Sequence, residues 1–182
     1  MIAREENGGR HTAKIYRDIV SGWGASEDIV MECAMDNTMC KHPPIVLPFE
    51  LAMQLGFQGD GMFKSIPDKH KIFMNPLVKF QLIPSQRATY YLGSRGGFDG
   101  AISAFYPNVL DNLCRIFNDD LYVMISSASE CILHLASSIS ASEVRKFVKI
   151  AARNSQNFDE SADQIDAAMY SYTREKRNLT KL

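Results

Sequence analysis

The chain has 182 residues, 46% of them hydrophobic and 23% charged, a balance typical of a globular protein with a packed core. Twenty basic and 21 acidic residues give a net charge of −1, which excludes a global field that would concentrate nucleic acid or imitate its phosphate backbone. The charged N-terminal residues and the absence of an apolar run of about 18 residues argue against a secretory signal and a membrane span. We therefore expect a cytoplasmic protein.

One domain over residues 1–182 is expected, because domains commonly hold about 100–200 residues. Within it the sequence predicts a helical N-terminal subregion, 1–57, and an α+β core, 88–175. Residues 57–87 between them carry a proline or a glycine every few positions, which indicates irregular structure with one or two edge strands.

Three short helices are predicted in the N-terminal subregion. The first spans residues 12–22, with Thr12 as its cap. The second follows Ser26 as N-cap and ends before the prolines at 43 and 44. The third spans residues 48–55, with proline at a first-turn position. The second helix is expected to bury five apolar side chains: Ile29, Val30, Cys33, Ala34 and Met35.

The α+β core is predicted to start with a strand, 88–92, that turns back on a second strand, 101–105. Residues 109–117 then place apolar side chains at i, i+3 or i+4 and i+7, the pattern of one buried helical face. Two more strands are expected at 121–125 and 131–135, each a short apolar run bounded by polar residues.

Two helices are predicted to complete the chain. Ser140 or Ser142, with Glu143 behind it, is suited to cap the first, and the second runs from residue 159 to about 174. This order of elements predicts the α+β class, with an antiparallel sheet covered by helices and a helical N-terminal part. The last helix is expected to turn four side chains inward: Ile165, Ala168, Met169 and Tyr172.

A polar run at 126–130 separates the two central strands and raises the question of a catalytic serine. A nucleophile elbow needs glycines around its serine, and Ser126, Ser127 and Ser129 have none. We interpret the run as a hairpin turn whose hydroxyls satisfy backbone amides. No catalytic residue is predicted, and a serine hydrolase that uses this turn is kept as an alternative.

No cofactor or metal site is predicted either. Gly56, Gly59 and Gly61 are spaced somewhat like the glycines of a phosphate-binding loop. Such a loop has a lysine directly after its last glycine, whereas Lys64 stands three residues after Gly61, so we expect a surface loop. Cys33, Cys40 and His42 provide too few ligands for zinc, at spacings that match no zinc motif. We expect all four cysteines to be reduced and buried.

Charge changes sign near the C-terminus, where four acids between 159 and 166 precede four bases after residue 172. On a helix this order complements the macrodipole, which is the simpler interpretation. The functional alternative is a surface that docks on an acidic or phosphate-bearing partner. Six residues are the candidates for this partner-binding surface: Tyr170, Tyr172, Arg174, Lys176, Arg177 and Lys181.

Four short motifs lie within residues 90–172: Gly100 with Ala101, Tyr106 and Pro107 before Val109 and Leu110, the run from Asp120 to Val123, and Ser126, Ser127 and Glu130. In these motifs residues 90–172 resemble an uncharacterised family, a domain of unknown function common in anaerobic gut bacteria and their mobile elements. The family has a proline before its serine pair and a histidine before its glutamate, where this chain has Ile125 and Ser129. Loss of that histidine argues against catalysis in the turn.

In length and character the whole chain is also similar to anti-CRISPR proteins of phages and plasmids, which inhibit the type II RNA-guided DNA nuclease. This resemblance implies a non-enzymatic inhibitor that binds the CRISPR nuclease–guide RNA complex and blocks target DNA binding or cleavage in a bacterial host cell. It leaves room for local contact with DNA or RNA. The remaining alternative to inhibition, besides the serine hydrolase, is a small DNA-binding regulator from a mobile element.

Overall fold

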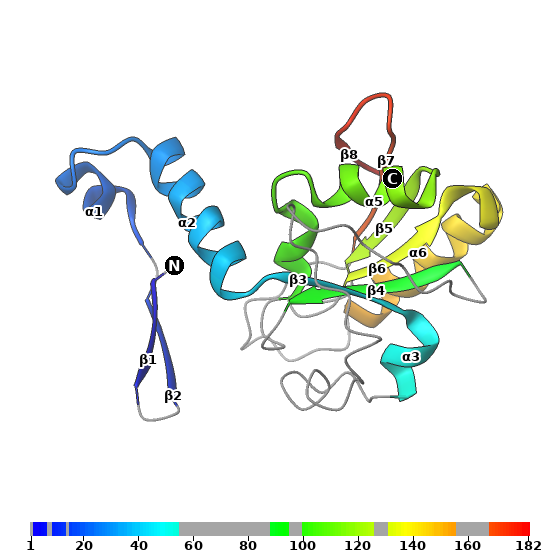
Figure 1. Ribbon diagram of the computed structural model, residues 1–182, viewed down its shortest axis with the longest axis horizontal. Coiled ribbons are helices and arrows are strands. Elements are labelled where there is room, and N and C mark those ends of the chain that lie inside the picture. The colour runs from blue at the N-terminus through cyan, green and yellow to red at the C-terminus, as the bar shows by residue number, and fades with distance from the viewer. Residues whose placement is uncertain are drawn as a thin grey trace. The chain divides into compact units, whose positions relative to one another are not determined.

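The computed structural model describes residues 2–6, 9–13, 15–54, 88–94, 100–125, 131–155 and 168–182. The chain divides into two compact units, Met1–Thr38 and Met39–Leu182. The larger unit is built on a six-stranded antiparallel sheet with helices, and the smaller one contains a hairpin followed by helices (Figure 1). This arrangement confirms the predicted α+β class and the helical N-terminal part.

The N-terminal unit contains a two-stranded hairpin and two helices. The strands β1 (Ile2–Glu6) and β2 (Gly9–Ala13) pair antiparallel. The helix α1 (Arg17–Gly22) follows, and α2 (Glu27–Lys41) begins in this unit. In the part of the chain that the structure describes, no helix combines the length and the apolar character that a membrane crossing requires.

The predicted helix over 12–22 is wrong in its first part. Thr12 lies in β2, opposite Ala3 of β1, and the helix begins only at Arg17. In the hairpin, β1 provides hydrogen-bond partners for the backbone groups of β2. The pattern of residues 12–22 alone contains no information about this partner strand.

The helix α2 confirms its predicted start but not its predicted burial. Ser26 Oγ accepts a hydrogen bond from the backbone N–H of Ile29 at 3.3 Å, as an N-cap does. However, α2 has no buried side chain: Ile29 is 55% exposed, and Cys33 is exposed as well. Among the described side chains of the N-terminal unit, Val20 of α1 is the one that is buried.

The sheet of the larger unit has the strand order β3-β4-β6-β5-β7-β8, with every neighbouring pair antiparallel. The predicted strands at 88–92, 121–125 and 131–135 are confirmed. Their bounds and those of the other strands are β3 Pro44–Pro48, β4 Thr89–Ser94, β5 Leu121–Ile125, β6 Cys131–Leu135, β7 Ala168–Tyr172 and β8 Leu179–Lys181.

Sequence reasoning missed β3 because Pro44 was interpreted as a helix stop and Pro48 as the first turn of the next helix. The strand is Pro-Ile-Val-Leu-Pro, and all five residues are buried. Proline cannot donate a hydrogen bond to a sheet, so it is tolerated mainly on edge strands. The strand β3 lies at one edge of the sheet and pairs with β4 alone, which agrees with this restriction.

The predicted strand at 101–105 is wrong, because Gly100–Phe105 forms the 3₁₀ helix η2. Both edges of β4 are already occupied, one by β3 and the other by β6. A strand that follows β4 in the chain therefore has no place beside it.

The predicted helix from 159 to 174 is wrong where the structure describes it. Ala168–Tyr172 forms β7, which pairs with β5 on one side and β8 on the other. The basic residues that follow therefore lie in the connection from β7 to β8 and in β8 itself, not at the end of a helix, so the dipole interpretation of their charge does not apply. The acids at 159–166 lie outside the described residues.

Helices cover both faces of the sheet. Tyr90 of β4 contacts Phe117 of α5 (Val109–Phe117), with ring centroids 4.5 Å apart, and its neighbour in the register is Leu133. The next position, His134, stacks at 5.4 Å on Phe147 of α6 (Ala141–Ser155). Because consecutive strand residues point to opposite faces, α5 and α6 lie on opposite sides.

The helices of the larger unit largely follow the predictions. The predicted helix at 109–117 is confirmed as α5, and Ser140 caps α6 in a capping box in which Glu143 Oε2 accepts from Ser140 N at 2.9 Å. Their bounds are α3 Phe49–Gln54, η2 Gly100–Phe105, α5 Val109–Phe117, η3 Ala136–Ser138 and α6 Ala141–Ser155. The residues 57–87 and the serine run 126–130 lie outside the described residues.

Leu133 on the central strand β6 should be a main support of this fold. Its side chain is fully buried, so Leu133→Ala is expected to lower the free energy of unfolding by about 2–5 kcal/mol in chemical denaturation. The matched control is Leu182→Ala, since Leu182 is 51% exposed and should lose less than about 1 kcal/mol. Equal losses in the two variants would contradict the described core.

Candidate functional site

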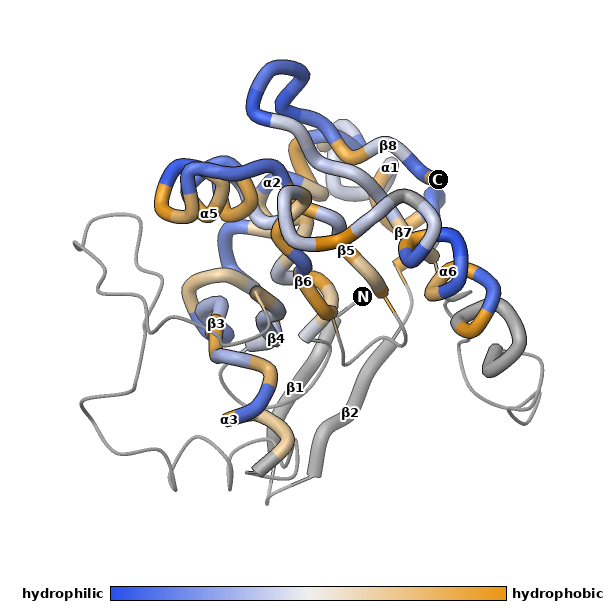
Figure 2. The backbone as a smooth tube through the Cα atoms, turned by 90° about the vertical axis from the view of Figure 1, so that its right-hand side faces the viewer, coloured by the Kyte–Doolittle hydropathy of each residue, from blue (hydrophilic) through white to orange (hydrophobic). Residues whose placement is uncertain are grey.

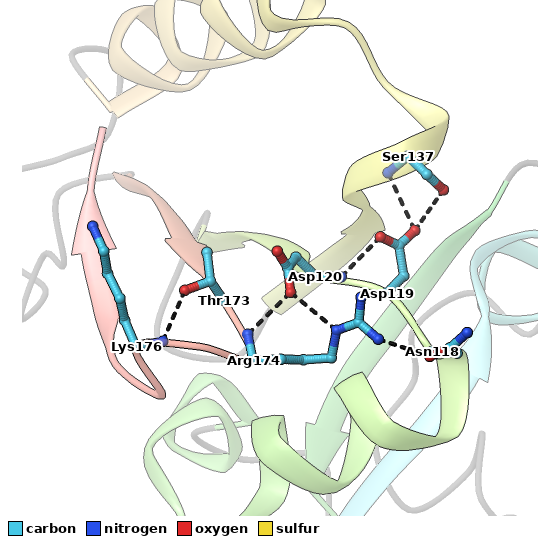
Figure 3. A network of polar contacts seen from close by, with 7 residues as sticks. All are labelled: Asn118, Asp119, Asp120, Ser137, Thr173, Arg174 and Lys176. Carbon is cyan, nitrogen blue, oxygen red and sulfur yellow. Dashed lines mark hydrogen bonds and ion pairs between the residues drawn. The ribbon is translucent and has the colours of Figure 1, made fainter.

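The polar side chains of the larger unit gather where α5 ends and where β7 turns into β8. Asp120 follows α5, and its Oδ1 accepts hydrogen bonds from Arg174 N at 3.0 Å and from Arg174 Nε at 3.3 Å. Arg174 Nη1 donates to Asn118 Oδ1 at 2.7 Å (Figure 3). These contacts attach the β7–β8 turn to the loop after α5.

Asp119 attaches the same loop to η3. Its Oδ1 accepts from Asp120 N at 2.8 Å, and its Oδ2 accepts from Ser137 N at 3.2 Å and from Ser137 Oγ at 2.5 Å. The loop after α5 thus joins two connections that are distant in the sequence (Figure 3). We interpret Asp119 as a structural residue, because both carboxylate oxygens are used inside the fold.

Asp111 of α5 forms a second centre, in which one carboxylate holds two arginines. The side chain of Asp111 is 8% exposed. Arg177 Nε lies 3.0 Å from Oδ1, and its Nη2 donates to Oδ2 at 3.1 Å, a bidentate pair. Arg115, one helical turn after Asp111, pairs with Oδ2. The arginine side chains remain 55% (Arg177) and 65% (Arg115) exposed, so the anion lies beneath the cations.

The turn itself is closed by its own backbone. Arg177 adopts a left-handed conformation with φ of 50°, and its N–H donates to the Thr173 carbonyl at 2.9 Å. Thr173 Oγ1 also accepts from Lys176 N at 3.2 Å. Figure 2 shows the connection between β7 and β8 as a hydrophilic segment that projects from the sheet. The turn therefore holds a defined shape and presents its charges outward.

The six predicted partner-binding residues occupy different environments. Tyr172 is buried in β7, and Tyr170 is half-buried in the same strand. Both lie on the α5 side of the sheet, because they pair with Leu121 and Val123. Burial, followed by the negative charge of Asp111, raises the pKa of Tyr172. The remaining four are exposed: Arg174, Lys176 and Arg177 in the turn and Lys181 in β8.

Sequence reasoning missed the acidic partners of this surface. Asp111 and Arg115 stand four residues apart on a predicted helix, a spacing that brings side chains together, so that ion pair was accessible from the sequence. The contact of Asp111 with Arg177 joins residues 66 positions apart. No local signal indicates it, because it exists only once β7 lies under α5.

Burial affects the cysteines and the histidine in the sheet region of the larger unit. Burial, followed by the charge of Asp120, raises the pKa of Cys114 to about 12, and burial also raises the pKa of Cys131. His134 hydrogen-bonds Thr89 Oγ1 through Nδ1 at 3.1 Å. Among the described residues, no buried side-chain nitrogen or oxygen lacks a partner, and no three His, Cys, Asp or Glu side chains are grouped as metal ligands.

The cysteines divide into two classes, contrary to the expectation that all are buried. Cys114 and Cys131 are buried, but Cys33 and Cys40 are exposed on α2. All four are free thiols. Their apolar neighbours in the sequence indicated burial, but α2 has no packed face that would provide it.

Comparison with known families identifies the chain's relatives. Residues 1–174 match a family described as "Family of unknown function (DUF5688)". The chain belongs to this family. The predicted resemblance to a domain of unknown function is thereby confirmed, and the match includes the N-terminal unit. No curated protein and no solved structure matches the chain.

Asp111 should contribute to stability through its two arginines. Asp111→Asn keeps the shape of the side chain but removes the charge that holds Arg115 and Arg177, so the free energy of unfolding should fall by about 1–3 kcal/mol. Chemical denaturation measures this loss. The control Glu175→Gln removes an exposed charge of the same turn and should change stability by less than about 0.5 kcal/mol. If Asp111→Asn left the free energy of unfolding unchanged, the described ion pairs would be refuted.

His134 should make the fold less stable in mild acid. Burial lowers its pKa below the usual 6.5, so the unfolded chain takes up this proton at a higher pH than the folded chain does. As the pH falls from about 7.5 to about 5, the wild type should therefore lose stability relative to His134→Gln. Denaturation at several pH values measures the difference between the two proteins.

The variant Glu143→Gln is the control that distinguishes titration of His134 from titration of a carboxylate. Hydrogen bonds from Ser140 lower the pKa of Glu143 below 4.5, so its contribution is lost only when the pH falls below that value. This variant should follow the wild type over the same interval. If His134→Gln shows the pH dependence of the wild type, His134 is not the group that titrates.

Proposed function

We propose that the protein acts by binding an anionic partner, without catalysis, through a basic surface formed by Arg115, Arg174, Lys176 and Arg177. The single observation that carries this proposal is the arrangement around Asp111. A buried carboxylate anchors two arginines whose side chains remain more than half exposed. Their outer N–H groups are available to phosphate or carboxylate oxygens, which guanidinium groups bind in a bidentate manner.

The basic surface is held in place before a partner arrives. Arg174 is fixed by Asp120 and Asn118, and Arg177 is fixed by Asp111. Side chains that are already ordered lose less conformational entropy on binding. This preorganisation compensates for a weak field, because the four cations stand against four nearby carboxylates, Asp111, Asp119, Asp120 and Glu175, for a net charge of 0.

The narrower proposal is that the partner is a type II CRISPR nuclease in complex with its guide RNA, and that binding blocks engagement or cleavage of target DNA. It is supported by the resemblance of the whole chain, in length and character, to anti-CRISPR proteins. Such a complex presents RNA phosphates as well as protein carboxylates. The compartment proposed is the bacterial cytoplasm, where the exposed thiols of Cys33 and Cys40 would remain reduced.

A cleavage assay with purified nuclease and guide RNA tests this proposal. Equimolar protein should slow cleavage, and Arg115→Gln with Lys176→Gln should weaken binding by about tenfold. The matched control is Arg145→Gln with Lys149→Gln, which removes two exposed cations from α6 and should leave binding unchanged. With four cations engaged, log Kd against log salt should have a slope no steeper than about 4.

Other results would select another function. A shift of duplex DNA without any nuclease, weakened by the same Arg115 and Lys176 substitutions, would indicate the DNA-binding regulator. Ester hydrolysis that disappears on substitution of Ser126, Ser127 and Ser129 by alanine would indicate the hydrolase. A chain that neither binds nor slows the nuclease rules out the inhibitor.

A further inference from the structure

The N-terminal unit exposes apolar side chains to an unusual extent for its size. Val20 is the single buried residue among its described side chains. A soluble surface seldom carries several large apolar residues in one small unit unless they bind something. The exposed ones and their exposed fractions are Tyr16 63%, Ile19 40%, Trp23 52%, Ile29 55% and Met31 65%.

The helix α2 lacks the packing that helices of its length usually need. It has 15 residues and no buried side chain. Isolated helices of about 12–15 residues are marginal in water, and most helical stability in proteins comes from packing of one face. A partner that covers α2 would provide this missing contribution.

Two methionines form one row along α2, and two acidic residues form the neighbouring row. Met31 and Met35 are four residues apart, so they lie on one face. Asp28 and Glu32 precede them by three residues each and therefore form the neighbouring row. Met31, Asp28 and Glu32 are exposed, and Met35 is half-buried. Methionine is flexible and polarisable, and it adapts to varied apolar partners.

The charge of this unit selects among the partners. Residues 15–38 carry five acids and one base, a net charge of −4. The base, Arg17, is already paired with Glu27 at 3.1 Å. Two copies of this unit would repel each other, because like charges would meet at the contact. A cationic partner with apolar side chains complements both rows.

We propose that the acidic methionine surface, formed by Asp28, Met31, Glu32 and Met35, binds a basic amphipathic helix of another protein. The apolar side chains of that helix contact Met31 and Met35, and its lysines or arginines pair with Asp28 and Glu32. This mode corresponds to a helix docked along an apolar face with charged rims. The inference is independent of the basic surface, which lies in the other unit.

Two dye-labelled peptides test the inference with the full-length chain. One is an amphipathic helix of leucine and lysine, and the other has glutamate in place of every lysine. Fluorescence anisotropy should show binding of the lysine peptide only, weakened by added salt. Methyl spectra of the chain labelled at methionine should show shifts at Met31 and Met35, assigned with single leucine variants.

Paired variants locate the contact. Met31→Gln with Met35→Gln should weaken binding of the lysine peptide by about tenfold or more. The control Met53→Gln changes a 55% exposed methionine of the other unit and should leave this binding unchanged. Asp28→Lys with Glu32→Lys should abolish binding of the lysine peptide and create binding of the glutamate peptide. Glu175→Lys is the charge control and should do neither. Circular dichroism checks that every variant keeps its helix content.

Three results would overturn the inference. The first is no binding of the lysine peptide, and the second is equal binding of both peptides. The third is a shift of the Met31 and Met35 methyl signals with protein concentration alone, which would identify a second copy of the chain as the occupant of this surface.

Discussion

The structure depends on the antiparallel pairing of β5 with β6, whose inner residues form the buried centre of the larger unit. Leu121, Val123 and Ile125 alternate with half-buried neighbours along β5, and Leu133 of β6 lies opposite Val123. Apolar burial on this scale is the main favourable term in folding. Because β5 also pairs with β7, the same strand positions the turn that carries the basic residues.

The candidate binding surface follows directly from that pairing. β7 enters the sheet beside β5 and places Arg174 next to Asp120, just after α5, and Arg177 next to Asp111, in the first turn of α5. The carboxylates lie inside or at the border of the fold, and the guanidinium groups face solvent. A buried acid that has lost both arginines would be costly, so stability and the orientation of the basic surface are linked.

The two units have contrasting surfaces. The larger one has a well-packed core and a braced, cationic turn, whereas the smaller one has one buried side chain among those described and an acidic, methionine-bearing helix. Within the larger unit the buried thiols have raised pKa values, and His134 is held between Thr89 and Phe147. We propose that the basic surface binds an anionic partner and the acidic methionine surface a cationic one.

The sequence by itself determined the elements whose signals are local: α5 from its apolar period, the strands on both sides of the serine run from their composition, and α6 from the cap at Ser140. Only the tertiary structure decided the roles of the ambiguous segments. Ala168–Tyr172 is a strand because it pairs with the edge of β5 that β6 does not occupy. Gly100–Phe105 is not a strand, because β3 and β6 occupy both edges of β4. Pro44–Pro48 can be a strand despite its prolines, because it lies at the edge of the sheet. Tertiary structure also brings Asp111 and Arg177 together and leaves the apolar side chains of α2 without a packing partner. Hydrogen bonding between strands and contact between distant side chains depend on neighbours in space, and the order of residues does not specify these neighbours locally.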